Sequence, residues 1–312
     1  MRKVSFVIIM CILLLFCGCK SDIKQEKAEV TPYIRVDNIS YEKVPFEIKG
    51  IELSSPQQIA ALGDMLYICD LGNSRVIVCD LQGNAVNEIG RIGPTQGGFI
   101  EPTCIAVSDS QICVYDRRGS KILVLTPGGE PVLEYDLSET FSPISEVVNI
   151  EIIDDGTVYF SLVSFSKHIG DAGVYMIKGS NTVKISDLTV GCLTEHGNNI
   201  YFMSKYELDD DKNWISGYAE LLTITGEKYE RISAFSNSYS AVGIECSDNR
   251  IYAYNDCFQC VDAFSLNGDY IATLFSEPVQ NNFIYKGFCM DKNGNFYLSD
   301  SRGNVIYRLE KK

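Results

Sequence analysis

Short apolar runs recur along the chain from residue 65 onward, each bounded by polar turn residues. Six of these runs align, and successive runs begin 46, 46, 42, 51 and 45 residues apart. Five of the six carry Tyr at the third position, and all are rich in β-branched, aromatic or other apolar residues, as β-strands are. The runs cover residues 65–70, 111–116, 157–162, 199–204, 250–255 and 295–300. A period of about 45 residues predicts a repeat protein built from strands.

Each repeat has room for four strands. In the first repeat they are expected at residues 58–61, 66–70, 75–80 and 86–89, with tight turns at 63–64 and 82–84. A glycine turn between the third and fourth strands recurs at 128–129, 179–180, 225–226 and 267–268, and supplies the positive φ that short hairpins need. Four antiparallel strands per repeat are typical of a propeller blade.

The sixth repeat ends after three strands, at Lys312. An edge left unpaired there would be a liability for a closed disc. Residues 41–48 form an otherwise unassigned segment of apolar and polar residues that can supply the missing outer strand. The expected fold class is therefore all-β, a six-bladed beta-propeller closed by an N-terminal strand in the last blade, and we expect a monomer.

Two segments carry a resemblance to a known family. The glycine-rich stretch 88–99 leading to Pro102, and the turn 70–76, are similar to those of six-bladed propellers of the NHL and TolB-like type. That group includes lipoproteins common in Bacteroidota. The resemblance covers residues 33–312 and implies the propeller fold, whereas function stays open because the family contains both binding proteins and enzymes.

The N-terminus reads as an export signal. Arg2 and Lys3 precede an apolar run that ends at residue 16, too short to span a membrane. The sequence 16–19 resembles a bacterial lipobox, which implies a signal peptide at 1–18, lipidation of Cys19 and a tether over 19–32. The expected location is the bacterial cell envelope, with the membrane reached through the lipid anchor. An ordinary secretory signal is the alternative.

Loop lengths predict one functional face. The connections at 91–102, 138–148, 164–173, 205–219 and 276–285 are long, and we expect all of them on the same side of the disc, opposite a set of tight turns. Long loops held by a rigid scaffold often bind ligands, although each residue on them could equally be an ordinary surface group. The candidate ligand-binding residues are Arg91, Arg117, Arg118, His168, Tyr206, Trp214, Tyr218 and Arg302.

Composition and motifs remove several classes of function. The net charge of −14 disfavours nucleic acid as a partner. Cys257 and Cys260 form a single CxxC pair without the second ligand pair that a zinc site needs. Cysteines on the predicted first strands, such as Cys104, read as core residues, and Asp70, Asp116 and Asp300 read as turn residues that accept backbone hydrogen bonds. No nucleotide loop or nucleophile motif is found, so no cofactor is expected.

Two hypotheses of function remain. In the first, the loop face of an envelope lipoprotein binds a peptide, protein or glycan partner without catalysis. In the second, the propeller is a hydrolase, lactonase or lyase that uses a central divalent cation. Glu151, Glu195 and Glu245 lie on or next to first strands and could face the central channel, which keeps the second hypothesis open.

Overall fold

The computed structural model describes residues 30–31, 35–90, 98–164, 170–187, 189–208, 214–216, 218–236, 239–279 and 285–312. At 30–31, 189–190, 205–208, 214–216, 218–219 and 234–236 it describes the backbone only. The predicted signal peptide and Cys19 lie outside these residues, as do Arg91 and His168. No helix in the described part of the chain has the length and apolar character needed to cross a membrane.

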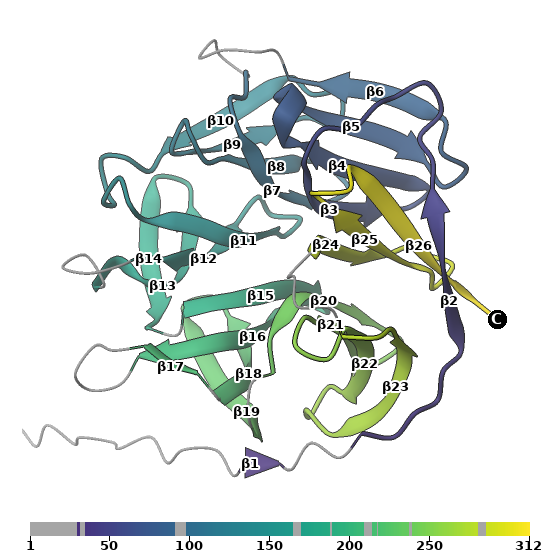
Figure 1. The fold of residues 1–312 in the computed structure, drawn as a ribbon. Helices are drawn as coiled ribbons and strands as arrows, with labels where there is room; N and C mark the ends of the chain where they lie inside the picture. The colour runs from purple at the N-terminus through teal and green to yellow at the C-terminus, as the bar shows by residue number, and fades with distance from the viewer. Residues whose placement is uncertain are drawn as a thin grey trace, which may run out of the picture.

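Six sheets, each built on four antiparallel strands, surround a common axis, which confirms the predicted six-bladed propeller (Figure 1). The first three blades follow one another in the sequence. Blade 1 holds β3 (Pro56–Leu62), β4 (Met65–Asp70), β5 (Arg75–Asp80) and β6 (Ala85–Ile89), with the short 3-10 helix η1 (Leu71–Asn73) after β4. Blade 2 holds β7 (Pro102–Val107), β8 (Ile112–Asp116), β9 (Lys121–Leu125) and β10 (Pro131–Asp136). Blade 3 holds β11 (Glu146–Ile152), β12 (Val158–Val163), β13 (Gly173–Lys178) and β14 (Asn181–Ser186).

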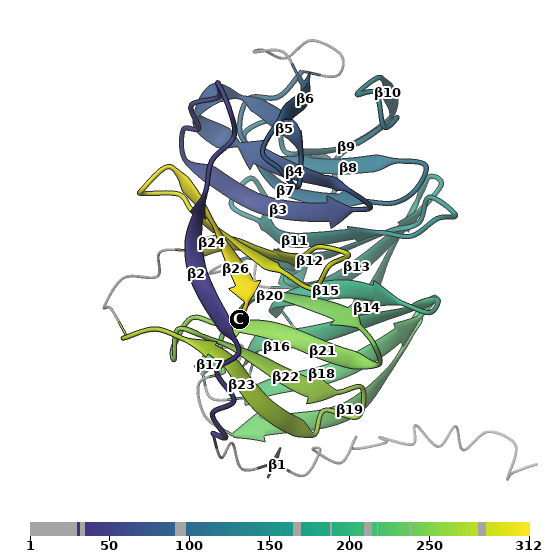
Figure 2. The ribbon, with the colours of Figure 1, turned by 90° about the vertical axis from the view of Figure 1, so that its right-hand side faces the viewer.

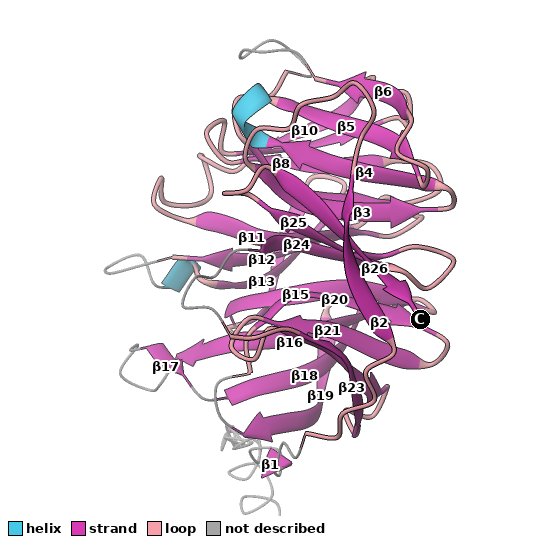
Figure 3. Ribbon diagram, turned by 45° about the vertical axis from the view of Figure 1, so that its right-hand side comes forward, coloured by secondary structure: helices cyan, strands magenta, loops and turns pink. Residues whose placement is uncertain are grey.

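The remaining three blades complete the ring. Blade 4 holds β15 (Thr189–His196), β16 (Asn199–Leu208), β18 (Tyr218–Thr225) and β19 (Lys228–Ser236), with the added strand β17 (Trp214–Ser216). Blade 5 holds β20 (Ala241–Ser247), β21 (Arg250–Asn255), β22 (Cys260–Ser265) and β23 (Tyr270–Ser276). Blade 6 holds β24 (Tyr285–Met290), β25 (Phe296–Asp300), β26 (Val305–Lys311) and the N-terminal β2 (Tyr41–Phe46). Figure 3 shows that strands and loops make up almost all of the described chain.

The N-terminal segment closes the ring, as the sequence predicted. Strand β2 pairs antiparallel with β26, from Tyr41 opposite Lys311 to Phe46 opposite Ile306. The same segment also pairs with the outer edges of other blades. The short strand β1 (Val30–Thr31) runs parallel to β19, Asp37 bridges Thr273 in β23, and Lys49 bridges Asn84 in blade 1. Figure 2 shows β2 crossing the rim of the disc beside β26.

The core consists of apolar layers between neighbouring blades. Each of the six apolar clusters combines residues from two adjacent blades, and the cluster between blades 6 and 1 includes Phe46 and Ile48 of the closing segment. A middle strand is covered on both faces, so β8 and β12 are buried at every position. This arrangement explains why the repeated runs are continuously apolar rather than alternating. The five repeated tyrosines are buried too: Tyr67, Tyr159, Tyr201, Tyr252 and Tyr297.

Glycines close the turns between third and fourth strands where the sequence predicted them. Gly83, Gly129, Gly179, Gly226 and Gly268 all have positive φ. One predicted long loop is different from the expectation. The segment 205–219 is not an irregular connection, because β16 continues to Leu208 and pairs there with β17. Tyr206 lies in this extension of β16, whereas Trp214 and Tyr218 begin β17 and β18.

Aspartates at the ends of the second strands hold the connections between strands. Asp300 accepts hydrogen bonds from the backbone N–H groups of Arg302 and Gly303 in the turn that follows it, as expected. Asp116 instead accepts from Ile100 and Glu101 in the connection that enters its own blade. These aspartates therefore stabilise the loop face of the disc rather than catalyse a reaction.

Candidate functional site

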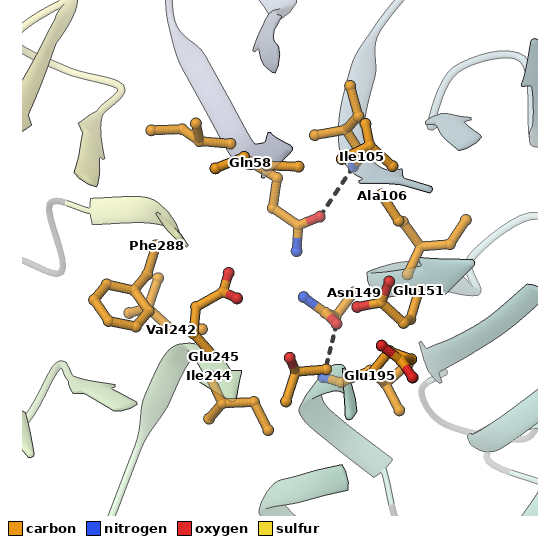
Figure 4. Close-up of a pocket in the computed structure, with 18 residues that line it drawn as sticks. Gln58, Ile105, Ala106, Asn149, Glu151, Glu195, Val242, Ile244, Glu245 and Phe288 are labelled. Atoms are coloured by element: carbon orange, nitrogen blue, oxygen red, sulfur yellow. Dashed lines mark hydrogen bonds between the residues drawn. The ribbon is translucent and has the colours of Figure 1, made fainter. Parts of the chain in front are cut away.

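The six innermost strands (β3, β7, β11, β15, β20 and β24) line a central channel. They enclose a cavity of about 170 Å³ in the middle of the disc (Figure 4). A wider cavity of about 690 Å³, called the funnel below, lies at the ends where these strands begin, which is the loop face. Gln58 and Val242 belong to the walls of both cavities, so the funnel leads into the channel.

The funnel takes its shape from irregularities in the innermost strands. Pairing shifts register near the start of β3, β7, β11, β20 and β24. A β-bulge redirects side chains and often lies beside a functional site. The residues at these shifts all line the funnel: Gln57, Gln58, Thr103, Val148, Val242 and Lys286. Five blades therefore turn a side chain toward one common space.

Charged groups of both signs line the funnel. Arg117 donates to Glu101 at 2.9 and 2.7 Å and lies 3.5 Å from Glu146, so its guanidinium is already paired. Lys286 is exposed, and the described residues give its ammonium no ion-pair partner. Asp256 contributes a carboxyl group to the same wall. The wall of the funnel thus offers a ligand a cationic group, carboxyl groups and apolar surface.

The predicted loop-face residues are only partly brought together. Arg117 lines the funnel, whereas Arg118 and Arg302 do not belong to its wall. Arg118 is 70% exposed and lies 3.9 Å from Glu101. Arg302 is exposed in the β25–β26 turn, where the neighbouring Ser301 is the residue that reaches the funnel. The side chains of Tyr206, Trp214 and Tyr218 lie outside what the structure describes.

Two amide side chains project into the channel and were missed by the sequence analysis. Gln58 and Asn149 are 7% and 8% exposed. The Gln58 Oε1 accepts from the Ile105 N–H at 3.1 Å, and the Asn149 Oδ1 accepts from the Leu193 N–H at 2.8 Å. Because each amide oxygen accepts from a backbone N–H, the nitrogen of the same amide points the other way, into the channel (Figure 4). The place of both residues on predicted innermost strands was the available signal.

The three glutamates proposed from the sequence do line the channel. Glu151, Glu195 and Glu245 all belong to its wall (Figure 4). Glu151 is half-buried, and its desolvation, reinforced by the nearby charge of Glu195, raises its pKa to about 8. Burial followed by the charge of Glu151 also raises the pKa of Glu245 well above its usual value. The environment of the channel thus favours the protonated form of both carboxyl groups.

This donor set does not fit the central cation of the second sequence hypothesis. The amide oxygens of Gln58 and Asn149 are directed at backbone N–H groups, and amide nitrogens cannot ligate a hard cation. In the described part of the chain, no group of three or more His, Cys, Asp or Glu side chains is arranged to hold a metal ion. The channel presents amide hydrogen-bond donors beside carboxyl groups.

The opposite face is less simple than the loop lengths suggested. A cleft of about 560 Å³ opens there between blades 2, 3 and 4. Its wall includes Asp109, Asp154, Asp155 and Glu195, and Lys178 pairs with Asp155 at 2.9 Å. The described part of the chain is therefore hollowed on both faces of the disc, and the prediction of one functional face stays a prediction.

Replacing Glu151 should change how stability depends on pH. The folded protein holds a proton on Glu151 up to about pH 8, whereas an unfolded glutamate releases it near pH ~4.3. Between these values the folded state binds more protons, so the free energy of unfolding falls as pH rises. Between pH 5 and pH 8 the free energy of unfolding should therefore fall less in Glu151→Gln than in the unmodified chain. We expect the difference to be at least about 1.4 kcal/mol, the equivalent of one pKa unit.

Urea unfolding of both chains at pH 5 and pH 8 measures this difference. The exposed Glu139→Gln is the matched control and should leave the pH profile as it is in the unmodified chain. Parallel profiles for the unmodified chain and Glu151→Gln would contradict the raised pKa.

The fold and the funnel define the class of protein: a six-bladed propeller with a ligand-sized opening at its centre. The chain belongs to the DUF5128 family, described as a 6-bladed beta-propeller, whose sequence pattern matches residues 48–224, more than half of the chain. A search of curated proteins gave no match.

Solved structures confirm the fold. A gluconolactonase from Xanthomonas campestris superposes with a TM-score of 0.61 at 12% identity, over 91% of this chain and 96% of that one. A protein described as exported, from Bacteroides fragilis, gives 0.59 at 12% identity, over 91% and 100%. Virginiamycin B lyase from Staphylococcus aureus gives 0.55 at 11% identity, over 87% and 100%. At such low identity these likenesses concern the fold alone.

Proposed function

We propose that this protein is an envelope lipoprotein whose loop-face funnel binds a peptide, protein or glycan partner without catalysis. The observation that carries this proposal is the set of register shifts in five innermost strands, which turn side chains into one funnel. Irregular pairing at the same end of five strands redirects side chains, as β-bulges beside functional sites often do. The volume of the funnel, about 690 Å³, lies in the usual range for ligand sites.

The absence of catalysis is supported by the chemistry of the groups that line the funnel. Cys104 is the obvious nucleophile there, but burial raises the pKa of its thiol to about 12, so the reactive thiolate is scarce at neutral pH. Arg117 is paired with Glu101, and Glu146 lies beside it. A hydrolase, lactonase or lyase with a central cation has less support, because the channel amides present nitrogen rather than oxygen.

Filling the funnel should abolish binding. Ser301 lies in the wall of the funnel, in the turn between β25 and β26, and we expect Ser301→Trp to weaken binding of the partner at least about tenfold by steric exclusion. Asp109→Trp places the same side chain in the cleft of the opposite face and is the matched control. Peptide and glycan arrays probed with the full chain and both variants measure the effect.

Equal binding by the unmodified chain and Ser301→Trp, or loss of binding only in Asp109→Trp, would overturn the placement of the site. Turnover of a lactone or ester by the purified chain, lost in Ser301→Trp, would overturn the absence of catalysis.

The envelope location rests on the lipobox-like sequence around Cys19, which lies outside the described residues. We expect the full chain to fractionate with membranes and to incorporate labelled palmitate, and Cys19→Ser to lose both properties, since stable anchoring needs the acyl chains. Unchanged fractionation of Cys19→Ser would contradict the anchor.

A further inference from the structure

The centre of the channel presents a set of polar atoms that the binding function proposed above does not yet explain. Gln58 and Asn149 are more than nine-tenths buried, and their amide nitrogens face the same open space as the Glu245 carboxyl group (Figure 4). The Asn149 nitrogen has no hydrogen-bond partner among the described residues. The Gln58 nitrogen has one long contact, 3.5 Å from the Val148 carbonyl oxygen. Both nitrogens open onto the channel cavity, so a molecule that enters the channel can accept hydrogen bonds from them.

The three groups together match one hydroxyl group. A hydroxyl oxygen accepts two hydrogen bonds and donates one. The two amide nitrogens provide two donors, and an oxygen of Glu245 provides one acceptor. A carbonyl oxygen has no hydrogen to donate to the acceptor oxygen of Glu245, and a cation would meet two N–H groups of the wrong polarity.

We propose that Gln58, Asn149 and Glu245 bind a hydroxyl group of a neutral carbohydrate that enters the channel through the funnel. The ligand is neutral because the cavity wall contains no Lys or Arg to pair with an anion. A cationic sugar is disfavoured because its ammonium group would meet the N–H groups of Gln58 and Asn149.

Carbohydrate is favoured over peptide by the way the cavities connect. The channel cavity, about 170 Å³, is small and ends a wider funnel. Other hydroxyl-binding groups continue along the funnel wall from the channel: Gln57, Thr103 and Ser301. A saccharide carries hydroxyl groups on successive carbons, so it can form hydrogen bonds in the channel and along the funnel wall at once. A peptide presents hydroxyl groups only on some of its side chains.

This inference rests on the proposed binding function, and the test separates the two. The full chain is titrated calorimetrically with a panel of neutral sugars (glucose, galactose, mannose, maltose and lactose), their charged counterparts glucuronate and glucosamine, and Ca²⁺. Side-chain amide resonances of Gln58 and Asn149 are followed by NMR. We expect a neutral sugar to bind and to shift both resonances, with the charged sugars at least about tenfold weaker.

Two variants keep the fold-stabilising oxygen and remove only the donor. Asn149→Asp still accepts from the Leu193 N–H, and Gln58→Glu still accepts from the Ile105 N–H. Each should weaken sugar binding at least about tenfold, whereas Gln82→Glu, the same exchange in an exposed turn, is the matched control and should stay within about threefold. A cation site would respond in the opposite direction, because each new carboxylate would strengthen it.

Three results would overturn the proposal. In the first, Ser301→Trp abolishes sugar binding, whereas Asn149→Asp and Gln58→Glu leave it unchanged. This result would place the ligand in the funnel alone, and the proposed function would stand. Absence of binding and of amide shifts with every neutral sugar would leave only water in the channel. Ca²⁺ binding strengthened by Asn149→Asp would assign the channel to a cation.

Discussion

A chain that begins at Ile48 is expected to lose at least about 5 kcal/mol of its free energy of unfolding, or to lose cooperative unfolding altogether. The truncation removes β2, whose six residues pair with β26, and with it the buried side chains of Tyr41 and Phe46. Burial of each large apolar side chain contributes about 1.5–3 kcal/mol, and each backbone hydrogen bond about 0.5–1.5 kcal/mol. The total approaches the stability of an ordinary domain, about 5–15 kcal/mol.

A chain that begins at Ser40 is the matched control for this truncation. It loses the pairing of β1 with β19 and of Asp37 with Thr273 but keeps β2. Urea and thermal unfolding followed by circular dichroism compare the two chains. Equal transition midpoints would show that the closing strand adds nothing, and that the segment before residue 40 holds the ring instead.

Asp70→Ala is expected to reduce the free energy of unfolding by about 3–5 kcal/mol, the usual result of breaking a buried ion pair. Asp70 is fully buried and accepts from the Ser54 N–H at 2.7 Å, from Asn73 Nδ2 at 2.8 Å and from Arg75 Nε at 2.8 Å. Alanine would leave the Ser54 N–H and the Arg75 Nε–H without their acceptor, whereas Asn73 Nδ2 would keep the Glu52 carbonyl oxygen. Arg75 would keep only Glu88 as an ion-pair partner.

The matched control for Asp70→Ala is Asp109→Ala, an exposed turn aspartate, whose effect should stay within about 0.5 kcal/mol. Both are measured by urea unfolding, and the dependence on urea concentration should be the same in the two variants. A loss below about 1 kcal/mol for Asp70→Ala would mean that Arg75 and the Ser54 N–H find other partners at little cost.

Some of the site could be foreseen from the chain. Glu151, Glu195 and Glu245 were correctly placed in the channel because the repeat alignment assigns each to an innermost strand, and such strands converge on the axis. Arg117 was correctly placed at the loop face for the same reason. Gln58 and Lys286 were missed, because their direction depends on register shifts in β3 and β24, and neither shift has a signature in local sequence.

The sequence by itself determined the repeat, the strand count of each blade, the glycine turns and the use of residues 41–46 to close the ring. Each of these follows from local preferences repeated at a regular interval, or from the need to cover an edge. Only the tertiary structure decided which way the amides of Gln58 and Asn149 are turned, since the backbone N–H groups that orient them belong to neighbouring blades. It also decided the shape of the funnel and the cleft on the other face, because cavities form between blades that are distant in the chain.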